Sequence, residues 1–399
     1  MRTFTAATLM GLSLGWTSCS DALTTKDVPH MFSAMNHFNL KFDPTANGDS
    51  LQVEDGWQRL DAGRVVLRTF DLPSFEYQPG IQLSLTLQSA GDPWDKSGAV
   101  FILPKGSAID LRSFESGEYQ LDSASRAYPA IAPFKDGSYA PPIELLRFIT
   151  PFGVGHFSHM ERADEYRPVY IPHWEDSVAW HADISHLWEE LEGAVTIGVY
   201  LDTWSKEGHF LDMSLAFSAP PKLVIPVEKK HVKSLINTTK ISSKQQHYDG
   251  FATSDLNMAF DLPSNASHAT LHYHATGHGG HSEGDEFVAC EHQLFMDGEL
   301  VKKFTPWRDD CASFRPFNPS SGVWTERTFW RGDSIDERIA SSDYSRSGWC
   351  PGSLVEPTSI ALGSLEAGSH ALRVSIPTAQ TFSDTAMNFW NVAAYLTWE

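Results

Sequence analysis

A segment dense in titratable side chains lies between two strand-like stretches in the second half of the chain. It runs from Leu271 to Phe295, and its glycines leave the middle of the segment too free for regular structure. The flanking stretches are rich in residues that favour strands, and the first alternates apolar with polar positions. A rigid sheet that carries such a polar loop is a common setting for a functional site. The titratable candidates in it are His272, His274, His278, His281, Glu283, Asp285, Glu286 and His292.

Three further segments place charged and aromatic side chains at the ends of predicted strands. They are residues 91–103 with Trp94, Asp95 and Lys96, residues 199–204 with Asp202 and Trp204, and residues 346–353 with Arg346, Trp349 and Cys350. A single Asp at a strand end often only closes a turn. Several carboxylates in one cleft, however, push their pKa values apart, so that one can orient water while another donates a proton.

The histidines raise an alternative chemistry. His272 and His274 form a His-x-His pair on one face of a strand, and His278 and His281 follow, a pattern that can hold a transition metal. Copper monooxygenases that hydroxylate peptide glycines use paired jelly rolls and a similar pair. The first half of the chain lacks an adjacent His–His pair, and no Met is a persuasive ligand. We therefore expect no cofactor and keep these four histidines only as candidate metal ligands.

The composition excludes some classes of partner and favours others. The 50 acidic and 30 basic residues give a net charge of −20, which repels phosphate backbones, and the only basic cluster (229–233) is short. We therefore expect no binding of nucleic acid. The 13 Trp residues supply flat faces on which sugar rings can stack, although many of them must fill the core. A non-catalytic glycan-binding module is thus a second alternative, which needs aromatic platforms but no set of carboxylates.

The chain divides into an export signal and two β-rich regions. Residues 1–21 combine Arg2, a short apolar stretch and small residues, as secretory signals do, and Cys19 lies where a lipoprotein would be cleaved and acylated. Short strands separated by Gly, Pro and Asp clusters then recur, and a Pro-rich stretch around Ala219–Val227 interrupts them. The predicted fold is all-β, with two tandem jelly-roll β-sandwich domains at residues 27–222 and 223–399.

The cysteines indicate one disulfide. Of the four, Cys19 belongs to the signal segment, so an odd number remains. Cys311 and Cys350 lie in two similar, turn-rich segments, and we predict that they pair, because an exported protein meets an oxidising compartment. Cys290 is then free and buried on its strand. The chain has no CxxC spacing, which argues against a zinc site.

Five motifs, taken together and in order, resemble those of the bacterial peptide-N-glycosidase F family. They are Trp94-Asp95, residues 147–151 (RFITP), Asp202-Thr203-Trp204, Glu286 with His292 six residues on, and residues 348–352 (GWCPG), within a similarity that extends from roughly Phe42 to Glu399. The resemblance implies two tandem jelly-roll sandwiches. It also implies hydrolysis of the amide between an N-glycan and asparagine, which leaves aspartate on the peptide and releases a glycosylamine.

The resemblance also implies residue roles. Asp95 matches the principal catalytic aspartate, Glu286 matches a second essential carboxylate that acts through a bound water, and Asp202 replaces a glutamate of the family. The implied substrate-binding residues are Trp94, Lys96, Trp204, Arg346 and Trp349. Lys96 stands where the family has arginine, so the charge is kept but the forked donor array is lost. Two family disulfides are missing, and residues 105–142 form an insertion without a clear counterpart.

These expectations define partners and location as well. The resemblance implies N-glycosylated peptides and glycoproteins as substrates, acted on by a monomer. An exported bacterial protein would be secreted, periplasmic or held at the cell surface, with membrane contact only if Cys19 is lipidated.

Overall fold

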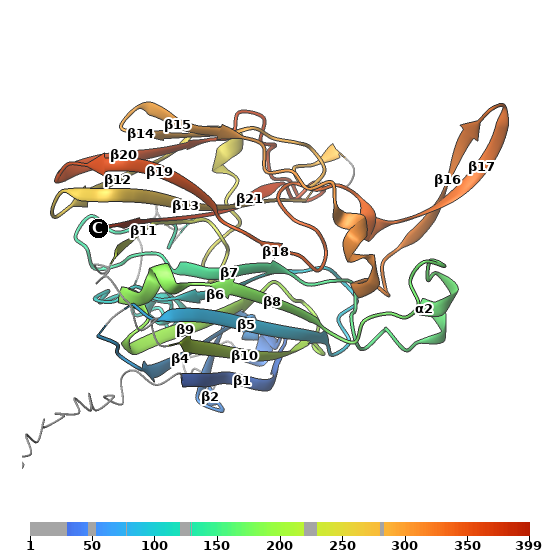
Figure 1. Ribbon diagram of the computed structural model, residues 1–399, viewed down its shortest axis with the longest axis horizontal. Helices are drawn as coiled ribbons and strands as arrows, with labels where there is room; N and C mark the ends of the chain where they lie inside the picture. The colour runs from blue at the N-terminus through green and yellow to red at the C-terminus, as the bar shows by residue number, and fades with distance from the viewer. Residues whose placement is uncertain are drawn as a thin grey trace, which may run out of the picture.

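Two β-sandwiches lie one above the other in the computed structural model (Figure 1). The structure describes residues 30–46, 53–76, 78–119, 128, 130–218, 230–279 and 283–399. The all-β double sandwich predicted from strand spacing is confirmed. The predicted signal segment with Cys19, the Pro-rich stretch at the proposed domain boundary and His281 lie outside the described residues. Within them, every helix is too short or too polar to span a bilayer.

The first sandwich packs a four-stranded sheet on a seven-stranded one. In spatial order the four-stranded sheet consists of β1 (His30–Leu40), β10 (His209–Ser218), β5 (Gly80–Ser89) and β8 (Val178–Asp183). The seven-stranded sheet consists of β18 (Leu354–Val355), β7 (Ile143–Ile149), β6 (Ser97–Ile102), β9 (Gly193–Leu201), β4 (Val65–Leu72), β3 (Trp57–Leu60) and β2 (Val53–Glu54). Along β5 every second residue is buried, so its apolar side chains face the core and its polar ones face outward. All seven residues of β7 are buried, because this strand is covered on both faces.

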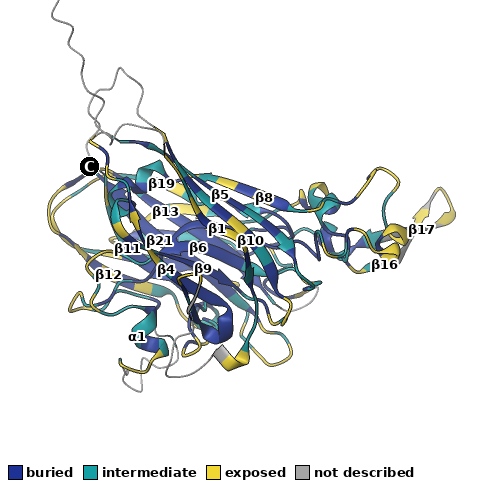
Figure 2. Cartoon of the chain, turned by 90° about the horizontal axis from the view of Figure 1, so that it is seen from below, coloured by how far each residue is buried: buried dark blue, intermediate teal, exposed yellow. Residues whose placement is uncertain are grey.

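The second sandwich is built from two four-stranded sheets and carries a long hairpin. Its sheets are β11 (His231–Asn237), β21 (Phe389–Trp398), β13 (Ala266–His278) and β19 (Thr358–Leu365), and then β12 (Leu256–Leu262), β20 (Gly368–Ser375), β14 (His292–Met296) and β15 (Glu299–Phe304). The hairpin of β16 (Val323–Trp330) and β17 (Asp333–Ala340) projects away from both sandwiches (Figure 1). Buried residues concentrate in the central strands, as Figure 2 shows, and exposed ones in the loops and the hairpin.

Helices are few and short. They are α1 (Leu111–Glu115), α2 (Glu161–Glu165) and the single 3₁₀ turns η2 (Pro44–Ala46), η3 (Asp61–Gly63), η4 (Ser185–Glu190), η5 (Gly250–Ala252), η7 (Cys311–Phe317) and η8 (Ser341–Asp343). The first of them lies in the predicted insertion. There Leu111, Phe114 and Tyr139 pack with Phe101 and Tyr200 of the seven-stranded sheet. The insertion therefore covers an outer face of that sheet.

The two sandwiches are tied together by a buried ion pair on β7. The Arg147 guanidinium donates to the Glu144 carboxylate at 2.7 and 2.8 Å, and both side chains are 1% exposed. The same guanidinium reaches across to the carbonyl oxygen of Asn391 in the second sandwich at 2.6 Å. The arginine of the RFITP motif is therefore an interdomain connector. Strand β18 provides a second connection, because it belongs to the second half of the chain and pairs with β7 of the first sandwich.

We predict that Arg147→Ala lowers the free energy of unfolding by about 3–5 kcal/mol, because it leaves the Glu144 carboxylate buried without its partner. Urea denaturation measures this effect. Lys303→Ala is the matched control, since its ion pair with Glu291 is solvent-exposed and screened by water, so its loss should leave the stability nearly unchanged. Equal losses in the two variants would show that the buried pair does not hold the sandwiches together.

Candidate functional site

The loop that carries Asp95 joins β5 to β6 and is anchored by a buried carboxylate. Asp92, 1% exposed, accepts a hydrogen bond from the backbone N–H of Trp94 at 3.0 Å and another from the Thr203 hydroxyl at 2.6 Å. On its other side the loop pairs with Thr150, whose backbone N–H donates to the Lys96 carbonyl at 2.8 Å. Asp95 is thus presented between two fixed neighbours, the loop after β9 and the loop after β7.

The loop after β9 carries Asp202 and Trp204. The Asp202 N–H donates to the Ser97 carbonyl at 2.9 Å, which brings this loop beside the start of β6. Arg64 lies 3.2 Å from the Asp202 carboxylate and 4.1 Å from the centre of the Trp204 ring. Trp204 is 54% exposed, so one face of the ring remains open beside these charges. The arrangement is a charged aromatic platform of the kind that suits a sugar ring.

The second sandwich supplies Glu286 and Arg346 from two loops that are hydrogen-bonded to each other. Ser347 donates its backbone N–H to the Glu286 carbonyl at 2.9 Å, and Arg346 pairs with Arg308 through two backbone hydrogen bonds of 2.8 and 3.0 Å. The two functional side chains therefore move as one unit.

The GWCPG motif fixes the end of this unit. Gly348 has a φ of +84°, and a Cβ there would lie 2.4 Å from the Ala275 carbonyl oxygen, so only glycine fits. The Trp349 indole N–H donates to the Gly277 carbonyl at 2.8 Å. Cys350 is joined to Cys311 by the predicted disulfide. Cys290 is free and buried, as expected.

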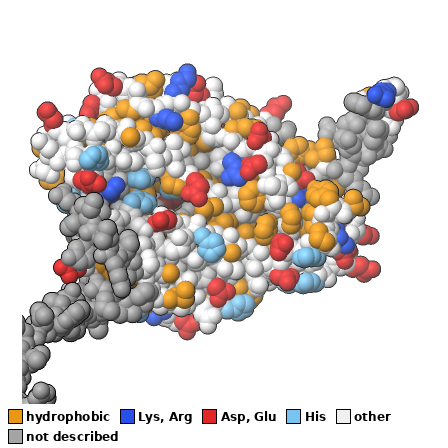
Figure 3. Space-filling model, viewed as in Figure 1, with side chains coloured by type: hydrophobic (Ala, Val, Ile, Leu, Met, Phe, Trp, Pro, Cys, Tyr) orange, Lys and Arg blue, Asp and Glu red, His pale blue; other side chains and the backbone are white. Residues whose placement is uncertain are grey.

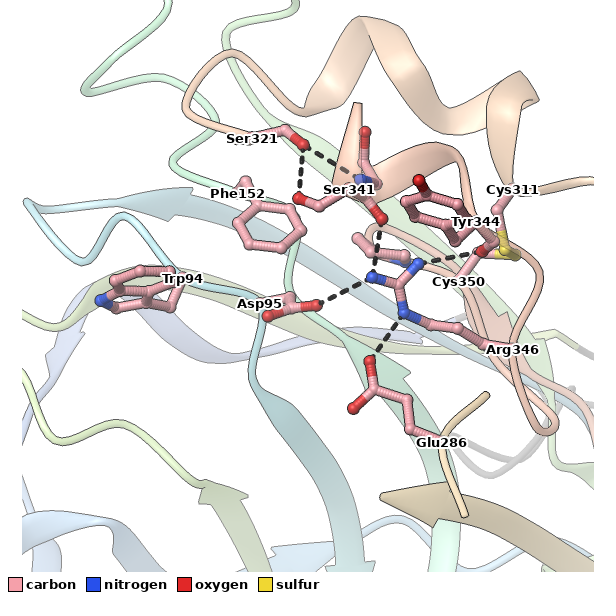
Figure 4. A network of polar contacts seen from close by, with 12 residues as sticks. Trp94, Asp95, Phe152, Glu286, Cys311, Ser321, Ser341, Tyr344, Arg346 and Cys350 are labelled. Carbon is pink, nitrogen blue, oxygen red and sulfur yellow. Dashed lines mark hydrogen bonds and ion pairs between the residues drawn. A yellow bond between two sulfur atoms is a disulfide. The ribbon is translucent and has the colours of Figure 1, made fainter. Parts of the chain in front are cut away.

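Arg346 joins carboxylates of the two sandwiches (Figure 4). Its Nε donates to Glu286 Oε1 at 2.9 Å, and its Nη2 lies 3.9 Å from Asp95 Oδ2. The remaining guanidinium N–H groups donate to the carbonyl oxygens of Tyr344 at 3.0 Å and Ser341 at 2.8 Å. Arg346 is 2% exposed, and the two carboxylates are 18% exposed. One buried cation thus contacts two partly exposed acids, one from each sandwich.

Burial is the main influence on these acids, and it raises both pKa values. It raises the pKa of Glu286 to about 7, against the opposing effect of Arg346, and the charge of Asp95 raises it further. Burial also raises the pKa of Asp95, although Arg346 and Lys96 lower it. Because the charge of Asp95 acts on Glu286, Asp95 is the acid that ionises first. Glu286 then retains its proton beside an ionised Asp95.

The two predicted binding aromatics on either side of the acids differ in exposure. Trp94 is 60% exposed and points away from Arg346 in Figure 4. Trp349 is only 3% exposed, and its ring lies 4.9 Å from the Arg346 guanidinium and 5.6 Å from the His278 ring. Trp349 therefore positions Arg346 rather than offering an open face to a ligand.

The candidate histidine ligands that the structure describes are packed inside the protein rather than exposed beside the two acids. His272 stacks with His186 and Tyr395, each with ring centroids 4.7 Å apart, at the contact between the sandwiches. Burial lowers the pKa of His272 and His278 to about 3 and that of His274 to about 4, so all three are neutral near pH 7. In the part of the chain that the structure describes, no three His, Cys, Asp or Glu side chains are grouped so that they could hold a metal ion.

Sequence reasoning missed two residues that complete the site, Asp92 and Arg64. The Asp-x-Trp spacing of an Asx turn is a local signal for Asp92, because its side chain caps the N–H two residues on. No local signal marks Arg64, which reaches Asp202 only because β4 and β9 are paired.

Comparison with known proteins agrees with this geometry. The family models described as "Peptide-N-glycosidase F, N terminal" and "Peptide-N-glycosidase F, C terminal" match residues 32–217 and 247–397. The solved structure of PNGF-II is 31% identical with a TM-score of 0.78, and the match covers 93% of this chain and 65% of that one. This chain belongs to the peptide-N-glycosidase F family.

A more distant structure shares the fold. PNGase F, described as a glycosylasparaginase from Flavobacterium meningosepticum, is 16% identical with a TM-score of 0.58, and the match covers 94% of this chain and 96% of that one. The present chain therefore spans about two thirds of the PNGF-II chain but nearly all of PNGase F. No functionally curated protein matches the sequence.

We predict that Asp92→Ala loosens both acidic loops, because it leaves the Trp94 N–H and the Thr203 hydroxyl without their buried acceptor. Each unsatisfied group costs about 1–3 kcal/mol. Hydrogen exchange should accelerate in residues 92–97 and 202–205 together. Asp136→Ala is the control, because Asp136 makes the same kind of turn with Ser138 on an exposed loop. Unchanged exchange in the loop after β9 would contradict the role given to Asp92.

Proposed function

We propose that the protein is a peptide-N-glycosidase that hydrolyses the amide between asparagine and the first N-acetylglucosamine of an N-glycan. The observation that carries the proposal is the contact of Arg346 with both Asp95 and Glu286, which brings together acids from the two sandwiches. Family membership supports the reaction type. The proposed domains are residues 27–222, which contribute Asp95 and Asp202, and residues 223–399, which contribute Glu286.

The chemistry requires a nucleophilic water and a proton for the leaving nitrogen. In our account ionised Asp95 accepts a hydrogen bond from the water and takes its proton as the water oxygen adds to the side-chain carbonyl carbon of asparagine. Protonated Glu286, held by Arg346, gives its proton to the amide nitrogen, and the carbon–nitrogen bond breaks. Aspartate remains on the peptide and a glycosylamine leaves. Proton exchange between the two acids restores the starting state.

Charge and aromatic groups around the acids supply binding. The Arg346 and Lys96 cations face the region where negative charge develops on the carbonyl oxygen, and they stabilise it. Asp202, held by Arg64, positions the sugar, with Trp204 as the stacking face. Trp94 lies next to Asp95 in sequence and is exposed to solvent. No metal or other cofactor enters this scheme.

The substrates in this account are N-glycosylated peptides and glycoproteins met outside the cytoplasm. Such substrates fit a secreted or cell-surface bacterial protein acting as a monomer. A non-catalytic glycan-binding module would use the same aromatic faces, and the product of the reaction distinguishes the two: an enzyme converts the peptide, whereas a binding module leaves its mass unchanged.

We predict that Asp95→Asn lowers kcat for a glycopeptide at least about a hundredfold, because the variant cannot take the proton of the attacking water. Mass spectrometry follows the conversion of the asparagine glycopeptide to the aspartate peptide. Asp261→Asn, at an exposed position of β12, is the matched control and should keep wild-type activity. Activity of Asp95→Asn near the wild-type level would reject the assignment.

We predict that kcat/KM falls as the pH rises through about 7. Burial raises the pKa of Glu286 to about that value, and only the protonated carboxyl group can give a proton to the leaving nitrogen. The initial rate at low substrate concentration, measured across pH 5–9, gives the profile. In Glu286→Gln the residual rate should lose this fall. A fall of the same shape in that variant would assign the titration to another group.

A further inference from the structure

Exposed apolar side chains gather at the end of the molecule from which the hairpin projects. Figure 3 shows hydrophobic side chains concentrated beneath the hairpin, over residues 157–174, which include α2 and are called the α2 segment below. The exposed apolar side chains in and beside this segment are Trp94, Met160, Tyr166, Val169 and Tyr170, between 38% and 102% exposed. Such a concentration on one face of a protein that carries 20 excess negative charges marks an interaction surface.

A cleft opens within this surface. Its volume is about 450 Å³, within the range of ligand-binding clefts. One wall is the α2 segment, with Phe157, Met160 and Tyr166, and the other is the chain entering the hairpin, residues 319–323. Pro93 forms the inner end. The cleft therefore ends two residues before Asp95.

The outward position of these side chains is not a result of a loose loop. The α2 segment has its own small core of Ala163, Ile171 and Trp174. Arg315, 1% exposed, lies 4.8 Å from the Trp174 ring centre and donates to the Tyr166 carbonyl at 3.4 Å. The segment is thus held firmly while it presents Met160 and Tyr166 to the cleft.

The opposite wall is connected directly to the acidic site. The Ser320 hydroxyl donates to the Pro93 carbonyl at 2.8 Å. The Ser321 hydroxyl lies 2.9 Å from that of Ser341, whose carbonyl oxygen accepts from Arg346 at 2.8 Å (Figure 4). The wall of the cleft is therefore linked by hydrogen bonds both to the Asp95 loop and to Arg346.

The order of strands gives the two sides of Asp95 different partners. Strand β6, which follows Asp95, has β9 on one side and β7 on the other. The loop after β9 carries the charged aromatic platform of Asp202 and Trp204. The chain after β7 leads through Phe152 to the α2 segment and the cleft. The cleft, whose lining combines apolar side chains with Arg162 and two serines, and the sugar platform thus lie on opposite sides of the acid.

We propose that this cleft binds the polypeptide part of the substrate, an extended segment with aliphatic or aromatic residues next to the glycosylated asparagine. The proposal rests on the proposed function, because the amide that is cut has a sugar on one side and a polypeptide on the other. If the sugar binds at the loop after β9, the polypeptide of the substrate extends from Asp95 in the other direction, toward the chain that follows β7. The enzyme therefore recognises peptide sequence as well as glycan, and prefers apolar flanking residues.

The test compares two substrates with one glycan. The first is a tripeptide with the glycosylated asparagine in the middle, and the second is a long peptide with leucine and phenylalanine flanking that asparagine. Wild-type enzyme should have the higher kcat/KM for the long peptide. The double variant Met160→Ser, Tyr166→Ser should lower the long-to-tripeptide ratio of kcat/KM about tenfold, through KM, because two apolar contacts are lost.

The matched control is Met31→Ser, Leu300→Ser, which removes two exposed apolar side chains outside the cleft and should keep the wild-type ratio. A ratio unchanged by the cleft variant, or lowered equally by the control, overturns the cleft while leaving the amidase intact. If the wild-type enzyme cleaves neither substrate, the proposed function fails. Fluorescence anisotropy of the long peptide without glycan then tests whether the cleft binds polypeptide. Binding that is weakened about tenfold only in the cleft variant supports the proposal. Equal binding by all variants, or no binding by the wild-type protein, overturns it.

Discussion

One buried guanidinium that serves two carboxylates is the constraint on which the rest of the structure depends. Taking Arg346, Glu286 and Asp95 partly out of water is costly, and a single cation cannot neutralise two ionised acids. The surrounding structure makes the arrangement possible. Backbone carbonyls satisfy the other guanidinium N–H groups, Trp349 packs against its face, and a disulfide closes the loop beyond it. What remains is a site whose electrostatics favour one retained proton, which is the condition for a donor acid and an acceptor carboxylate to lie side by side.

This constraint explains why the two sandwiches form one working unit. Asp95 belongs to the first and Glu286 and Arg346 to the second, so a small rotation between them would separate the acids. The Glu144–Arg147 pair opposes such a rotation from the inside, and β18 opposes it by placing a strand of the second half in a sheet of the first. Asp92 acts on a shorter scale, because it fixes the Asp95 loop to the Asp202 loop. The order of the strands then places the sugar platform and the cleft on either side of Asp95.

Much of the fold could be predicted from local pattern, and less of the site. Alternation such as that of β5 identifies half-buried strands, and the turn-rich segments around Cys311 and Cys350 predicted a disulfide that the structure contains. Asp95 and Glu286 were found through ordered motifs that span both halves. Arg64 could not be found in this way, because its contact with Asp202 depends on strand pairing 138 residues apart in sequence. The exposed Trp94 and the buried Trp349 also look alike in sequence, since only packing decides which indole face remains open. The histidines of β13 have a spacing typical of metal ligands, but the fold packs them among other side chains. Burial there keeps them neutral, so the pattern in the sequence did not indicate a metal site.

The most direct test of the account is a titration of the Asp95 and Glu286 carboxyl carbons by NMR of ¹³C-labelled protein. The account predicts that the two acids titrate as a coupled pair above the ordinary carboxyl range, with Asp95 ionising first and Glu286 keeping its proton until near pH 7. Replacing Arg346 by Met should raise both pKa values further, because the shared cation is lost. Two independent titrations near the ordinary carboxyl value of about 4, unaffected by that replacement, would contradict it.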